Sequence, residues 1–166
     1  HYDSHYAVGT YDGFNIRMVN RFDVLPVAGR MRQQFWTIIE IELEKHVLPH
    51  MFFVPTGNEG GEYGQVYAAR PNMQPLNAML LDKKSPEFYG RFQIVARPVN
   101  AAIIEAKFSS PLITTIASRF WPHGIEIERG KVLVYITEHR PTKAVLESAL
   151  ASGLWLAETI DKINED

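Results

Sequence analysis

The sequence predicts an α+β domain in which a mostly antiparallel, curved or barrel-like sheet of about seven or eight strands carries its helices on one side. Two observations indicate this fold class. Residues 6–55 place aromatic and β-branched side chains in alternation and are punctuated by turn residues, which is the pattern of half-buried strands. The spacing then changes, because 99–120 and 141–164 have helical periodicity while 124–139 returns to strand alternation.

The size and composition of the chain fit a single globular domain over residues 1–166. With 46% hydrophobic and 22% charged residues, it has the composition of an ordinary soluble protein. The absence of cysteine excludes disulfides, thiolate metal sites and thiol nucleophiles. A net charge of −2 without a clustered cationic stripe argues against nucleic acid as a partner. No apolar run approaches the ~18 residues that span a bilayer, so membrane contact is expected only through segments absent from this chain.

The first strands are the most regular part of the sequence. Within residues 6–27, the dipeptide Asp12-Gly13 separates two strand-like runs and predicts a hairpin turn. Residues 35–44 form the clearest strand, with apolar side chains on one face and glutamates on the other. The short apolar run at 51–55 predicts another strand.

The middle of the chain is less regular. Residues 56–64 contain four glycines and no apolar period, which predicts a mobile loop. Residues 65–69 are compatible with a strand, whereas 70–90 is broken by three prolines and predicts no defined element. Residues 91–97 form a strand that Pro98 stops.

Two short helices are predicted within 99–120, because Ser109 to Pro111 ends the first and begins the second. Residues 124–139 form a hairpin that turns at Arg129-Gly130, and we expect a bulge at Gly130 since Arg-Gly is a poor two-residue turn.

A long helix is predicted from about residue 141 to about residue 164, with an apolar stripe along one side. The small residues Ala149, Gly153 and Ala157 are four positions apart on this stripe. They would let the helix lie close to a partner surface, which we expect to be the sheet of the same domain.

The clearest strand carries Glu40, Glu42 and Glu44 at every second position. Carboxylates that alternate along one strand lie roughly 6.5–7 Å apart, which is near the separation found in inverting glycosidases. A catalytic acid must also be desolvated. Because these glutamates alternate with core residues and Lys45 follows them, we predict a solvated face and no catalytic residues. The same Ile-Glu-Ile-Glu pattern recurs at 125–128, and we interpret this repetition as coincidence.

The candidate metal ligands are His46 and His50, which have the spacing that binds zinc when both residues lie on one helix. Pro49 forbids a helix interior between them. In an extended chain they would be about 13 Å apart, so neither a metal nor another cofactor is predicted.

The candidate binding residues are aromatic or lie beside an aromatic residue. Trp121 and His123 flank Pro122 after a predicted helix and could form a partly exposed anchor. The alternative is that Trp121 fills the junction between helix and hairpin. Trp36 lies on the glutamate face of its strand, where it is covered by the C-terminal helix or forms an exposed patch for a partner.

The order of several core and turn residues resembles an uncharacterised bacterial family. The resemblance spans residues 34–165 and is clearest at KSPEFYGRFQIVARPVNAAIIEAKFSSPLITTIA (84–117). Family members have two predicted transmembrane helices followed by a cytosolic domain of unknown function. This chain departs from the family pattern at Lys84-Ser85, where an acidic residue is usual. The family positions are filled here by Phe88, Phe92, Ile94, Ala101, Ala102, Ser110, Pro111 and Leu112.

The resemblance implies a domain on the cytoplasmic face of a bacterial membrane, cut from a longer tethered protein. The start of the chain at His1, without methionine, fits that expectation. We therefore expect a non-enzymatic interaction or sensing module with a protein partner. One alternative is a hydrolase or metal-binding domain that uses Glu40, Glu42, His46 or His50. Another is a structural domain that self-associates through the Trp36 face or the final helix.

Overall fold

The structure is a computed structural model that describes residues 2–27, 29–45, 48–56, 70–76, 85–138 and 140–163. These residues form an eight-stranded antiparallel sheet, short helices and one long C-terminal helix, which confirms the predicted fold class. The strands are β1 (Tyr2–Tyr11), β2 (Phe14–Val27), β3 (Arg30–Glu42), β4 (Met51–Pro55), β5 (Gln74–Pro75), β6 (Phe92–Ala96), β7 (Gly124–Glu128) and β8 (Lys131–Ile136). The helices are α3 (Pro86–Tyr89), a 3-10 turn (Pro98–Asn100), α4 (Ala101–Lys107), α5 (Ser110–Phe120) and α6 (Lys143–Ile163).

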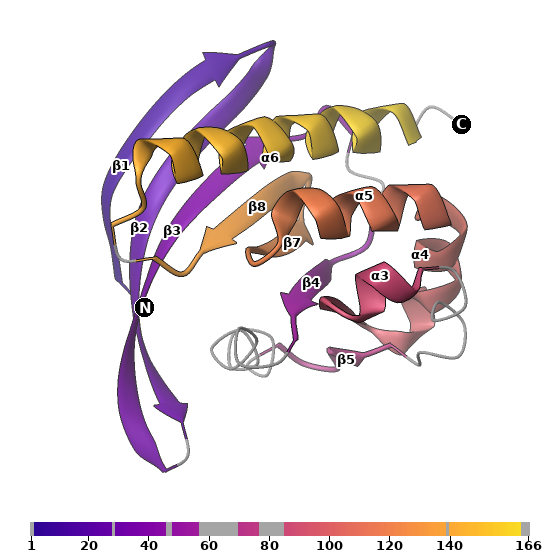
Figure 1. The fold of residues 1–166 in the computed structure, drawn as a ribbon, viewed down its shortest axis with the longest axis horizontal. Helices are drawn as coiled ribbons and strands as arrows, with labels where there is room; N and C mark the ends of the chain where they lie inside the picture. The colour runs from indigo at the N-terminus through magenta and orange to yellow at the C-terminus, as the bar shows by residue number, and fades with distance from the viewer. Residues whose placement is uncertain are drawn as a thin grey trace.

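The strand order of the sheet is β1-β2-β3-β8-β7-β4-β6-β5. Over the residues that the structure describes, the sheet is therefore open, with β1 and β5 at its two ends, and these eight strands do not close into a barrel. Strands β1, β2 and β3 follow one another as in the chain, but the late hairpin β7–β8 is inserted between β3 and β4. The described helices cover one face of this sheet (Figure 1).

The helix-covered face holds the larger hydrophobic core. Ile39 and Ile41 of β3 point into it, together with residues of every described α-helix. A Cβ atom added at Gly153 of α6 would lie 2.7 Å from Cδ1 of Ile41, so a larger residue at this position would require the Ile41 side chain to move. This contact confirms that the small residues of α6 face the sheet of the same domain.

The opposite face of the sheet holds a second, smaller apolar cluster. Side chains alternate along a strand, so Trp36 and Ile38 point away from the helices while Ile39 and Ile41 point toward them. The cluster consists of Trp36, Ile38, Phe52, Val54, Val95, Leu133 and Tyr135. We call this side of the sheet the open face, because no described helix contributes to its cluster.

Both predicted hairpin turns are present, but one differs from the prediction in detail. Asp12-Gly13 and Arg129-Gly130 each have two positive φ angles, as a type I′ turn requires. The neighbours Glu128 and Lys131 pair directly, so the bulge that we expected at Gly130 is not formed. A left-handed conformation at Arg129 makes the tight turn possible.

The strand and helix boundaries also differ in places from the sequence prediction. β3 begins at Arg30, earlier than expected, and forms a long hairpin with β2. A short helix occupies Pro86–Tyr89, where no element was predicted. The predicted strand at 65–69 and all of the predicted loop after Thr56 lie outside the described residues.

Candidate functional site

The open face of the sheet carries a row of paired residues that crosses five strands. The register places Arg17 of β2, Glu40 of β3, Leu133 of β8, Glu126 of β7 and Phe52 of β4 beside one another. Two carboxylates in this row are buried, and each is held by its own set of polar partners.

Glu40 is the first of these carboxylates and corrects a prediction, because it is only 6% exposed although we expected it to be solvated. Arg17 lies directly opposite on β2 and donates from Nε to Oε2 at 2.8 Å and from Nη2 to Oε1 at 2.9 Å. Lys131 adds an ion pair at 3.8 Å. The cross-strand arginine covers the carboxylate and compensates its charge. Glu42 and Glu44 are exposed, as predicted.

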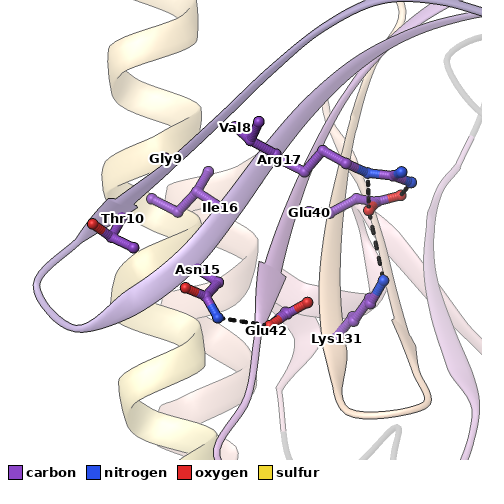
Figure 2. Close-up of a pocket in the computed structure, with 9 residues that line it drawn as sticks. All are labelled: Val8, Gly9, Thr10, Asn15, Ile16, Arg17, Glu40, Glu42 and Lys131. Atoms are coloured by element: carbon purple, nitrogen blue, oxygen red, sulfur yellow. Dashed lines mark hydrogen bonds and ion pairs between the residues drawn. The ribbon is translucent and has the colours of Figure 1, made fainter.

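A pocket of about 450 Å³ lies over this part of the open face. Figure 2 shows Arg17 and Lys131 converging on Glu40, while Asn15 reaches Glu42. The Asn15 amide donates to Glu42 at 2.9 Å. Two carboxylates thus line one pocket, but only Glu40 is buried, and both of its oxygens accept hydrogen bonds from Arg17. The pocket is suited to binding polar groups. Each of its two carboxylates already accepts a hydrogen bond from a neighbouring side chain. Its lining is completed by Val8, Gly9, Thr10 and Ile16.

Glu126 is the second buried carboxylate, with 1% of its surface exposed. The Tyr135 hydroxyl donates to its Oε2 at 2.5 Å, and His50 Nε2 lies 2.8 Å from its Oε1. Burial, followed by the charge of Glu126, raises the pKa of Tyr135 above its usual range, so the phenol keeps its proton and acts as a donor. The guanidinium of Arg70 is 3.6 Å from Glu126.

These residues also bear on the metal-binding alternative. One ligand atom from each of His50, Glu126 and Glu128 can be chosen so that all three lie within 4.8 Å of one another. The two ring nitrogens of His50, however, face different carboxylates, since Nδ1 is 3.8 Å from Glu128. Arg70 is 3.6 Å from both glutamates and supplies the positive charge between them. Arg129 adds a second guanidinium 3.8 Å from Glu128, so both carboxylates of the cluster are engaged by arginine side chains. His46, the other predicted ligand, lies outside the described residues.

Sequence reasoning overlooked Glu126 because it treated the second Ile-Glu-Ile-Glu run as coincidence. In both runs the first glutamate is buried and the second is more exposed. The common cause is position in the sheet, since Glu40 and Glu126 flank the same residue, Leu133, on adjacent strands. The repetition of Ile-Glu-Ile-Glu at 39–42 and 125–128 was the feature of the sequence that could have identified Glu126.

The candidate binding residues do not form one site. Trp36 is 1% exposed and packs edge-on against Tyr135, with ring centroids 5.5 Å apart. It is buried on the face away from α6. Both predictions for Trp36 are therefore wrong, since it is neither covered by the C-terminal helix nor part of an exposed patch. Trp121 packs edge-on against Phe92 at 5.7 Å on the helix-covered side, and His123 follows it, half-buried. Whether these residues bind a partner stays a prediction.

His123 gives a prediction about pH. Burial lowers the pKa of its imidazole below the ordinary value of 6.5, and the nearby charge of Glu138 offsets part of this effect. As the pH falls, His123 therefore takes up a proton in the unfolded chain before it does so in the folded protein. The stability associated with the neutral imidazole is fully present above pH 6.5 and is lost as the pH falls below that value. In urea unfolding from about pH 7 to about pH 5, His123→Gln should lose less stability than the wild type. Equal losses of stability in the wild type and in His123→Gln would contradict a role for His123 in this pH dependence.

The hairpin of β2 and β3 extends beyond the helix layer, at the lower left of Figure 1. We call residues 22–27 and 30–35 the β2–β3 ribbon. Cross-strand packing supports it, because the rings of Phe22 and Phe35 lie 4.9 Å apart. On this same face Phe35 is 37% exposed, Val24 47% and Met31 67%. Arg30 and Arg32 are exposed on the other face. The ribbon is thus amphipathic.

Comparison with known proteins supports the fold. The chain is similar to the crystal structure of the mycobacterial trehalose monomycolate transport factor A, TtfA, with a TM-score of 0.60 over 97% of this chain and 71% of that chain. The sequences are 11% identical, so the likeness concerns the fold alone. No family model and no curated protein matches the chain. Among the described helices, none is both long enough and apolar enough to cross a bilayer.

Proposed function

We propose that this domain is a non-enzymatic interaction module of a membrane-tethered bacterial protein, positioned at the cytoplasmic face of the membrane. It engages a protein partner through the open face of its sheet. The observation that carries the proposal is that the described helices all pack on one side, while the pocket of Arg17, Glu40, Glu42 and Lys131 lies on the other. A sheet face that carries an accessible polar pocket is available for recognition.

The chemistry of the open face supports binding over catalysis. A general acid needs a carboxyl group whose proton is retained by an apolar or like-charged environment. Glu40 and Glu126 are instead held by hydrogen bonds from neighbouring side chains, since Glu40 accepts two from Arg17 and Glu126 accepts one from the Tyr135 hydroxyl. Such pairs hold side chains in one orientation and create a defined pattern of donors and acceptors.

The partner-binding role can be tested by photocrosslinking from the rim of the pocket. Thr10 is exposed and lines the pocket from β1. With p-benzoylphenylalanine at position 10 of the intact protein in bacterial cells, irradiation should give a crosslinked product with a second protein. The same substitution at Val99, which is 82% exposed beside α4, is the matched control and should give none.

Each result of this experiment has a distinct meaning. Absence of any product at position 10, or equal products at positions 10 and 99, would contradict a partner on the open face. A product that contains two copies of the same protein would instead support the self-associating structural domain. Mass spectrometry of the crosslinked band separates a partner from a second copy.

A further inference from the structure

We propose that the β2–β3 ribbon is a docking element that rests on an anionic lipid bilayer. This inference relies on the proposed membrane tethering, which would keep the domain close to a bilayer. It adds a membrane contact made by the β2–β3 ribbon itself to the tethering that the proposed function includes.

The charge of the ribbon favours an anionic surface. The ribbon contains Arg30, Arg32 and Asp23, which gives +2 − 1 = +1, and Arg21 precedes it on β2. The whole chain has a net charge of −2, so the residues outside the ribbon sum to −2 − 1 = −3. A positive projection on an otherwise negative domain would turn the ribbon toward an anionic bilayer and the body away from it.

The apolar face of the ribbon supplies the second part of an interfacial contact. Val24, Met31 and Phe35 are exposed on the same face, beyond the helices that cover the equivalent face of the sheet. Burial of these side chains at the boundary of headgroups and acyl chains removes them from water. With the apolar face at the acyl boundary, the ribbon lies at the depth of the headgroups, and the long side chains of Arg30 and Arg32 on its other face extend toward the surrounding phosphate groups.

The size of the apolar face favours a bilayer over a protein. Six residues on each of two strands make a face of roughly 20 Å by 10 Å, which is about 200 Å². A stable protein interface buries about 800 Å² on each partner. A lipid surface requires no matching shape and adds attraction between charges, so a small amphipathic element is sufficient.

Vesicle cosedimentation of the 166-residue chain tests this proposal. The probes are vesicles of pure phosphatidylcholine and vesicles of phosphatidylcholine mixed in equal parts with phosphatidylglycerol. The chain should sediment with the mixed vesicles only, and high salt should release it. We expect Arg30→Glu combined with Arg32→Glu to weaken binding by about tenfold or more, and Val24→Ser combined with Met31→Ser to weaken it measurably.

The matched control is Val99→Ser combined with Ile103→Ser, which removes exposed apolar side chains away from the ribbon and should leave vesicle binding unchanged. Thermal melting of each variant checks that it folds. Absence of binding to the mixed vesicles, equal binding to both kinds, or binding that the ribbon variants leave intact would each overturn the proposal. If the vesicle result is negative while Thr10 still crosslinks to a partner, the ribbon inference fails and the proposed function stands.

Discussion

Replacement of Trp36 by alanine is expected to lower the free energy of unfolding by about 3–5 kcal/mol. Trp36 is among the largest fully buried side chains, and its removal would leave a cavity between Tyr135 and the neighbouring strands. The surrounding residues belong to a sheet, whose backbone spacing limits how far they can relax into the space. Urea unfolding monitored by far-ultraviolet circular dichroism measures the loss.

This result separates two roles of the tryptophan. A buried packing residue reduces stability when it is truncated, whereas an exposed binding anchor reduces affinity and leaves stability nearly unchanged. Trp121→Ala is the control, since Trp121 is half-buried and should cost less. If Trp36→Ala changes stability by less than about 1 kcal/mol, the packing assigned to the smaller cluster is wrong.

Replacement of Glu126 by alanine is expected to lower the free energy of unfolding by about 3 kcal/mol. The substitution leaves the buried Tyr135 hydroxyl without its acceptor and removes the carboxylate that holds His50 and Arg70. A buried donor without a hydrogen-bond partner destabilises the folded state by the full free energy of its desolvation. Glu128→Ala, two residues along the same strand, is more exposed and should change stability by about 0.5 kcal/mol or less.

A double-mutant cycle isolates the central hydrogen bond. Tyr135→Phe removes only the hydroxyl that donates to Glu126. The loss caused by Glu126→Ala should be smaller in the Tyr135→Phe background, with a coupling energy of about 1–2 kcal/mol. Additive effects of the two substitutions would show that this contact contributes little.

The parts of the fold that depend on local sequence were predictable. The turn at Asp12-Gly13 follows from residues that accept positive φ angles, and the break between α4 and α5 follows from Ser109 to Pro111. The start of β3 at Arg30 was missed, because residues 30–34 are almost entirely polar and have no period. These residues are strand only because β2 lies beside them and supplies hydrogen-bond partners.

The candidate site was less predictable because it depends on which strands become neighbours. Glu40 is buried because the β2–β3 register brings Arg17 opposite it, and a strand pattern alone carries no register between distant residues. Glu126 is buried because β7 lies between β8 and β4 in the interior of the sheet. Local periodicity identifies a strand but does not distinguish a central strand from an edge strand.

The insertion of the β7–β8 hairpin has a consequence for synthesis on the ribosome. β3 and β4 are made early, yet β3 can pair fully with β8 only once Ile136 has emerged, and β4 can pair with β7 only once that strand, Gly124–Glu128, has emerged. During that interval both nascent edges expose unpaired backbone groups, which attract other extended chains. Because the sheet is completed late in translation, the N-terminal strands present an exposed edge until the C-terminal half has emerged.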